Sequence, residues 1–125
     1  MRQGSVLLVA LLAGCSEGGE GDLVSSDVRI DFAGPEDTST AESVQMCVNA
    51  EGKVVVVWVD DRNGTGDVWL NRSADVGRTW NASATRISHG DSEATEPDVA
   101  CDGDDIYVVW EDDRDGELEN HNIYF

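Results

Sequence analysis

One eight-residue segment, residues 73–80, constrains the fold more than any other part of the chain. It reads Ser-Ala-Asp-Val-Gly-Arg-Thr-Trp. Gly77 allows a positive backbone φ, and the short side chains of Ser73 and Asp75 are suited to accept hydrogen bonds from nearby backbone N–H groups. Trp80 is suited to cover the turn with a large apolar ring. The segment therefore predicts a tight, internally bonded turn between two β-strands.

An internal repeat is the second constraint. Residues 54–62 read Val-Val-Val-Val-Trp-Val-Asp-Asp-Arg, and residues 106–114 read Ile-Tyr-Val-Val-Trp-Glu-Asp-Asp-Arg. Turn residues follow the arginine in both copies, and another short apolar run comes after them. Self-similarity at a period of roughly 50 residues is typical of solenoids and propellers.

The repeated unit predicts four antiparallel strands, at about residues 43–48, 53–60, 67–72 and 84–88. The second is a nearly unbroken run of apolar, mostly β-branched residues, as expected for a strand that is buried on both faces. Residues 28–30 resemble the fourth strand of this unit, so we expect an additional strand there that completes another unit. Helical periodicity is absent after the N-terminal leader.

The pattern formed by Ser73, Asp75, Gly77, Thr79 and Trp80 resembles the Asp box of the sialidase-like (bacterial neuraminidase repeat) β-propellers. The resemblance covers residues 28–125 and implies an all-β fold of antiparallel, four-stranded propeller blades. The propeller part would be residues 23–125, with blade one at about 43–88 and an incomplete blade two at about 95–125. Since a propeller needs roughly four to eight blades, we expect a truncated fragment of a longer protein; the alternative is that several chains share one ring. In this family the Asp box lies away from the catalytic face, which implies a structural role.

The first 22 residues predict export. Residues 1–14 form a signal peptide with a positive start and an apolar run too short for a transmembrane helix. The peptide ends in Leu-Ala-Gly followed by Cys15, which resembles a bacterial lipobox with Cys15 as the lipidated residue. The resemblance to bacterial lipoproteins implies a stable lipid anchor, and Ser16 implies the outer membrane. Residues 15–22 then read as a flexible acidic tether.

The charge balance excludes some partners. The 125 residues include 26 acidic and 8 basic side chains, and the formal net charge is −18. Such a surface repels nucleic acid and anionic lipid headgroups, so we expect no nucleic-acid partner. It also does not attract free sialic acid unless a local arginine cluster overrides the field. A solubility role for this charge is favoured over cation binding.

The repeated Trp-x-Asp-x-Arg element supplies one set of candidate site residues: Trp58, Asp60, Arg62, Trp110, Asp112 and Arg114. One interpretation is a ligand-facing acid and base. The favoured interpretation is an Asp–Arg bond that braces the turn after the second strand, because an active site needs only one copy.

Catalysis by a sialidase would need an arginine cluster, a Tyr nucleophile with a neighbouring Glu, and an Asp acid/base. Arg29 is the one weak catalytic candidate, because its surroundings only half match the family's first arginine element. A weak calcium candidate follows the second repeat: Glu111, Asp113 and Asp115 match the start of an EF-hand loop, but Asn122 replaces the bidentate Glu. An acidic turn is the simpler interpretation, and no other cofactor is expected.

Two cysteines remain after Cys15. Cys47 and Cys101 occupy similar positions in the two repeats, and an exported setting permits a disulfide between them. The alternative is a pair of buried free thiols.

The sequence thus favours an envelope lipoprotein that recognises a glycan or a protein at the cell surface, without catalysis by these residues. The competing hypothesis is an exo-α-sialidase or related glycosidase whose catalytic blades lie beyond residue 125. A third is a scaffold with no small-molecule ligand.

Overall fold

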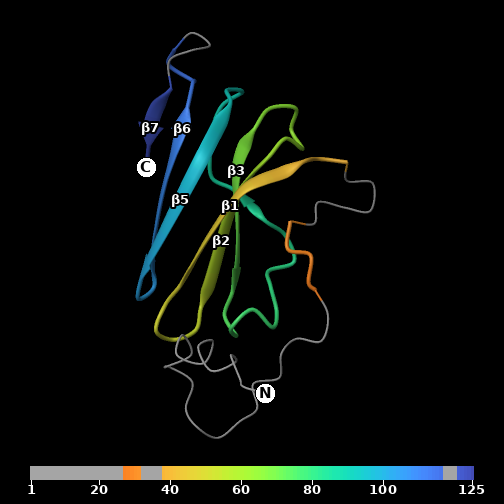
Figure 1. The fold of residues 1–125 in the computed structure, drawn as a ribbon, viewed down its shortest axis with the longest axis vertical. Helices are drawn as coiled ribbons and strands as arrows, with labels where there is room; N and C mark the ends of the chain where they lie inside the picture. The colour runs from red at the N-terminus through yellow and green to blue at the C-terminus, as the bar shows by residue number, and fades with distance from the viewer. Residues whose placement is uncertain (1–26, 32–37, 117–120) are drawn as a thin grey trace, which may run out of the picture.

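The computed structural model describes residues 27–31, 38–116 and 121–125. These residues form two antiparallel sheets and no helix, so the described part of the protein is all-β (Figure 1). The first sheet has the strand order β1-β2-β3-β4 and the second has the order β5-β6-β7. The strands are Ala41–Val48 (β1), Val54–Asp60 (β2), Asp67–Ser73 (β3), Thr85–Arg86 (β4), Ala94–Asp102 (β5), Asp105–Asp112 (β6) and Asn122–Tyr124 (β7). Within the described ranges, no helix is long and apolar enough to cross a membrane.

The first sheet contains the four strands expected from the sequence, with shifts at their ends. The largest difference is at β4, where only Thr85 and Arg86 pair with β3. The next two backbone N–H groups, those of Ile87 and Ser88, both donate to the carbonyl of Val68. This shared acceptor ends the ladder, so β4 is shorter than predicted.

Residues 27–31 lie outside both sheets, so the expectation of a strand at residues 28–30 is wrong. The Asn71 side-chain amide donates to the Ile30 carbonyl at 2.9 Å. The Arg62 guanidinium donates to the Asp31 carbonyl at 2.8 Å. Side chains of the first sheet therefore bond these backbone groups, in place of a neighbouring strand.

Strand β2 is the centre of the core, and all of its residues are buried. On one face, Val57 packs with Val68 of β3 and with the second sheet. On the other face, Trp58 lies in a cluster that is covered by Ile30, Trp69, Trp80 and Ala84. This two-sided burial is the reason that β2 has no polar alternation until its last residue.

The second sheet packs against the first with the face that carries Trp110. Trp110 belongs to the same buried cluster as Val57 and Val68, and Ala94 at the start of β5 joins them. β6 and β7 pair Trp110 with Tyr124, just as β2 and β3 pair Trp58 with Trp69. The two sheets are thus equivalent in the pairing of their second and third strands. Trp110 lies on the face toward the first sheet, whereas Trp58 lies on the face that Ile30 and Trp80 cover.

Both first strands carry the same irregularity. The register shifts between Glu42 and Gln45 in β1 and between Thr95 and Asp98 in β5. Ser43 and Glu96, one in each strand, have positive φ values of 52° and 49°. These are β-bulges, which leave a backbone N–H without a ladder partner and so accommodate the proline at position 97.

Candidate functional site

The residues of the Asp box close their own turn, as the sequence predicted. The Ser73 hydroxyl donates to Asp75 Oδ1 at 2.8 Å and accepts the Gly77 N–H at 2.9 Å. Asp75 also accepts the backbone N–H of Thr79 at 2.8 Å and its hydroxyl at 2.7 Å. The Trp80 indole N–H donates to the Gly77 carbonyl at 3.1 Å. The hydrogen bonds from Thr79 and Ser73 lower the pKa of Asp75 to about 2.

The same turn docks on the β1–β2 turn of its own sheet. The Val76 N–H donates to the Gly52 carbonyl at 3.0 Å, and Val76 has a positive φ of 62°. Gly52 has a φ of +81°, and a Cβ placed there would lie 2.9 Å from Val76 Cγ2. The Asp box therefore acts as a structural clamp, and its aspartate is hydrogen-bonded to Thr79 and Ser73.

The first copy of Trp-x-Asp-x-Arg is an internally bonded unit. Asp60 is completely buried. It accepts the Trp58 indole N–H at 3.3 Å, the Arg62 backbone N–H at 2.9 Å and the Arg62 Nε–H at 2.9 Å. Burial opposes ionisation, but the hydrogen bonds from Arg62 and Trp58 outweigh it and hold the pKa of Asp60 below its ordinary value. The Arg62 guanidinium also lies over the Trp69 ring, 4.2 Å from its centroid.

The second copy repeats this geometry. Asp112 is completely buried and accepts the Trp110 indole N–H at 3.2 Å and the Arg114 backbone N–H at 2.9 Å. Ser92 adds a hydroxyl donor at 2.8 Å. Burial again opposes ionisation, and the bonds from Arg114 and Ser92 outweigh it, so the pKa of Asp112 is well below its usual range. Arg114 lies 3.9 Å from the Tyr124 ring centroid. In both copies the acid and base bond each other and brace the strand end.

The aspartate beside each motif acid has a role that sequence reasoning missed. Asp61 accepts the backbone N–H of Thr40 at 2.7 Å, and Asp113 accepts that of Glu93 at 2.9 Å. Each carboxylate thus holds the residue just before the first strand of its own sheet. The sequence does contain a sign of this role, because Asp61 and Asp113 occupy the same position in the two copies of the repeat.

A further buried acid was also missed. Asp67 is 1% exposed and accepts the Ser88 hydroxyl at 2.9 Å and the Asn63 amide at 3.1 Å. Arg86 forms an ion pair with it at 2.6 Å. This cluster joins the start of β3 to the end of β4. No repeated sequence pattern marks it, so it was not recognisable from the chain alone.

The calcium candidates do not assemble around a common point. Glu111 faces His121 at 3.8 Å, Asp113 holds Glu93, and Asp115 accepts the Tyr124 hydroxyl. Among the described residues there is no group of His, Cys, Asp and Glu side chains arranged to hold a metal ion.

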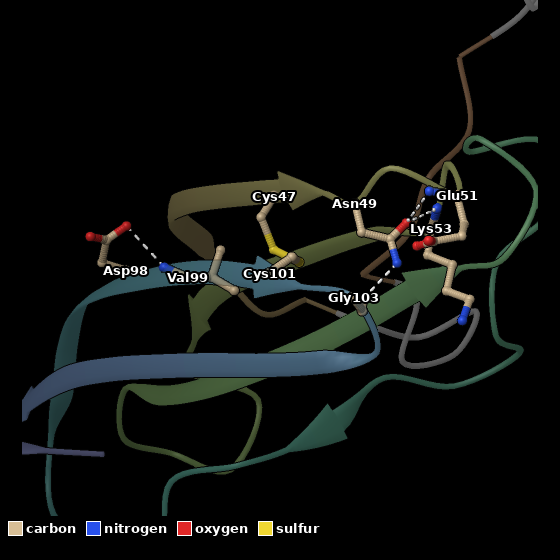
Figure 2. The surroundings of a disulfide bond; sticks show 8 residues. All are labelled: Cys47, Asn49, Glu51, Lys53, Asp98, Val99, Cys101 and Gly103. Carbon is tan, nitrogen blue, oxygen red and sulfur yellow. Dashed lines mark hydrogen bonds between the residues drawn. A yellow bond between two sulfur atoms is a disulfide. The ribbon is translucent and has the colours of Figure 1, made fainter.

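Cys47 of β1 and Cys101 of β5 are joined by a disulfide, which links the two sheets (Figure 2). Their positions in the two repeats are similar, as expected, but they differ by one residue. Cys47 pairs with Val55, whereas Cys101 pairs with Ile106. The residue equivalent to Cys47 is Ala100, which pairs with Tyr107. Because successive residues of a strand face opposite ways, this one-residue step points each sulfur toward the other sheet.

Two further bonds join the β1–β2 turn to the β5–β6 turn beside the disulfide. The Asn49 amide accepts the N–H groups of Glu51 and Lys53 at 3.1 and 2.9 Å and donates to the Gly103 carbonyl at 2.6 Å, as Figure 2 shows. The Lys53 ammonium pairs with Asp104. We call the end of the molecule formed by residues 49–53, 72–82 and 101–106 the Asp-box end.

Two hollows lie at the Asp-box end. The inter-sheet cleft has a volume of about 450 Å³, and its lining includes Lys53, Val55, Arg72, Asn81, Asp104 and Ile106. A smaller hollow of about 290 Å³ is lined by Arg29, Arg78 and Trp80 among others. Arg29 itself donates to Asp31 at 2.7 Å. The catalytic candidate Arg29 therefore lines a hollow beside the Asp box, and Arg78 lines the same hollow.

Cys15, the signal peptide at 1–14 and the tether at 15–22 lie outside the described residues. Comparison of the chain with protein-family models, with curated proteins and with solved structures found no match.

Proposed function

We propose that the two sheets are successive blades of a sialidase-like β-propeller on an exported, lipid-anchored protein that recognises a glycan or a protein at the cell surface. Support for the blades comes from the way the sheets repeat. The face of the first sheet that carries Val55, Val57 and Val68 is covered by the second sheet. The equivalent face of the second sheet carries Tyr107, Val109, Ile123 and Phe125, which are 41%, 38%, 70% and 82% exposed. An apolar face of this kind is what a third stacked sheet would cover.

A recognition function is supported by one observation. The buried acids of the repeated motif are bound to their own arginines and tryptophans, so they are not available to transfer protons to a substrate. The polar side chains that remain open to a ligand gather instead in the inter-sheet cleft at the Asp-box end. Ligand binding without bond cleavage is the chemistry that these residues fit best.

The test is retention of a ligand by the full-length chain. We expect the immobilised protein to retain specific members of a panel of glycans and cell-surface proteins, and to release no fluorophore from a fluorogenic sialic-acid substrate. Turnover of that substrate would favour the glycosidase alternative. Retention of nothing from the panel would favour a scaffold.

The lipid anchor is tested separately. In a bacterial host, the protein should incorporate radiolabelled palmitate and sediment with the outer membrane, and Cys15→Ser should abolish both. Equal labelling of the variant would rule out Cys15 as the anchor.

A further inference from the structure

We propose that the inter-sheet cleft binds the carboxylate of an acidic saccharide, and that Arg72 is the residue that holds this carboxylate. The inference rests on the proposed recognition function, and it adds the charge class of the ligand and the place where it binds.

The distribution of positive charge is the first observation. Three arginines of the described residues form ion pairs with buried aspartates, in the pairs Arg62–Asp60, Arg86–Asp67 and Arg114–Asp112. Arg72 differs from them, because its guanidinium has no hydrogen-bond or acidic partner among the described residues. The net charge of −18 repels anions from the surface as a whole. An anionic ligand therefore needs a local cation with no carboxylate bonded to it, and Arg72 is such a cation in the lining of the cleft.

The other cation of the cleft is already neutralised. The Lys53 ammonium is hydrogen-bonded to Asp104 across the two hairpin turns, and this bond raises the pKa of Lys53 above its ordinary value. Arg72 lies near enough to Lys53 to oppose that rise. The unbalanced positive charge of the cleft is therefore that of Arg72, whose planar guanidinium is suited to bind a carboxylate through two parallel hydrogen bonds.

At Arg72 the cleft offers side chains to a ligand, because the backbone N–H and carbonyl of this residue are already hydrogen-bonded. The Arg72 backbone N–H donates to the Asn71 side chain at 2.7 Å, and its carbonyl accepts the Asn81 N–H at 3.2 Å. An extended peptide, which binds by adding a strand to an open edge, finds no such edge at this point. A saccharide, in contrast, is bound through its hydroxyl and carboxylate groups. The Asn81 carboxamide has no side-chain partner within the described ranges. It therefore offers a donor and an acceptor for hydroxyl groups.

The cleft is also held in shape before a ligand arrives. Cys101 is part of its lining, and the disulfide to Cys47 fixes the separation of the sheets with a Cα–Cα distance of 5.8 Å. Val55 and Ile106 contribute apolar lining from the two sheets. Its volume of about 450 Å³ is within the roughly 300–1,000 Å³ range of small-ligand sites.

The test compares a matched pair of sugars on the full-length chain. Trigalacturonate is the acidic probe and galactotriose the neutral one, and binding is measured by titration calorimetry and by amide shifts in NMR spectra. We expect trigalacturonate to bind with shifts at Arg72, Gly103 and Ile106, and galactotriose to bind more weakly. Arg72→Gln should weaken trigalacturonate binding about ten- to a hundredfold, the worth of a hydrogen-bonded charge. Arg78→Gln, which removes an exposed arginine of the other hollow, is the matched control and should leave the affinity unchanged.

The outcomes separate this inference from the proposed function. Equal affinity for the two sugars, or no effect of Arg72→Gln, would overturn the carboxylate contact while glycan recognition stood. A triglutamate peptide that binds the cleft as tightly as trigalacturonate would overturn the choice of a saccharide. If a protein ligand is retained but neither sugar binds, the inference falls and the recognition function survives. Because Arg72 is exposed and bonds no described side chain, a fold defect in its variant is not expected, and unchanged amide spectra away from the cleft would verify this.

Discussion

Asp60 and Asp112 illustrate how an ionised carboxylate is stabilised inside a small β-protein. Each is completely shielded from solvent, where an isolated charge would be strongly unfavourable. Each receives bonds from a tryptophan two residues before it and an arginine two residues after it. The charge is thus compensated by near neighbours in the sequence, and the arginine in turn stacks on an aromatic ring of the next strand.

Removal of one partner from this unit should therefore be costly. Arg62→Met leaves the Asp60 carboxylate buried without its main donor, and we expect the free energy of unfolding to fall by about 3–5 kcal/mol. Arg72→Met is the control, because it removes an exposed arginine of similar size and should change stability by less than about 0.5 kcal/mol. Urea unfolding followed by tryptophan fluorescence measures both. Equal stabilities of the two variants would contradict a bracing role for Arg62.

The Asp75 carboxylate predicts an acid-sensitive contribution to stability. Its pKa in the folded protein is about 2 because Thr79 and Ser73 donate to the ionised form, whereas an unfolded aspartate titrates near 4. A folded pKa below the unfolded one stabilises the fold above pH ~4, and the effect is lost as the pH falls toward ~2.

The stability difference between the wild type and Asp75→Asn should accordingly shrink between these two pH values. Urea unfolding at a series of pH values measures the difference, and NMR titration of the Asp75 carboxyl carbon gives the midpoint directly. A midpoint near 4 would show that the Asp-box bonds do not persist in solution.

At the scale of elements, turns dock on turns. The Asp-box turn bonds the β1–β2 turn through Val76 and Gly52, and the β1–β2 turn bonds the β5–β6 turn through Asn49 and Gly103 (Figure 2). The strands of each sheet are held by their ladders, whereas the ends of the sheets are aligned by these contacts between loops. Glycine is required at Gly52 both for its positive φ and for the close approach of Val76.

Two glycine substitutions separate these requirements. Gly52→Ala and Gly103→Ala both force an alanine into a left-handed conformation, which costs about 1–2 kcal/mol. Only at Gly52 would the new methyl group also meet Val76, at 2.9 Å, since nothing lies within 4 Å of a Cβ at Gly103. We expect Gly52→Ala to be the more destabilising in urea unfolding. The reverse order would argue against docking of the Asp box on the β1–β2 turn.

At the scale of the whole molecule, the two sheets depend on contacts far apart in the sequence. The core cluster joins Val57 and Val68 of one sheet to Ala94 and Trp110 of the other. The disulfide closes a loop across a sequence separation of 54 residues. Such a link stabilises mainly by restricting the unfolded chain, so its effect belongs to the assembly of the sheets and not to either sheet alone.

The double variant Cys47→Ala with Cys101→Ala should lose about 2–4 kcal/mol of stability. Thermal and urea unfolding of the wild type, with and without a thiol reductant, provides the comparison. The reductant should lower the stability of the wild type toward that of the variant and leave the variant unchanged. A thiol assay before treatment shows whether the bond is formed in the wild type. If it is formed and the reductant still leaves the stability unchanged, a stabilising role for the bond is contradicted.

Much of the first sheet was predictable from the chain. The β-branched run of β2 and the turn residues after Arg62 locate a buried strand and its end, and the Asp-box pattern gives the bonds of its turn. The strand expected at residues 28–30 was wrong, because Ile30 and Asp31 resemble a strand locally yet are bonded by side chains of Asn71 and Arg62. The Asp67 cluster and the lining of the cleft were not predictable, since their members come from segments with no shared pattern.

The sequence by itself determined the internally bonded turns and the paired acids, because their hydrogen bonds connect residues only a few positions apart. The tertiary structure alone decided that Cys47 and Cys101 face each other, that Arg72 lines a cleft, and which apolar face remains exposed. These outcomes depend on register, since a shift of one residue turns a side chain to the opposite face of its sheet. The hairpin turns at residues 49–53 and 103–104 differ in length and set that register at the two cysteines. The packing of the two sheets then fixes what each face meets.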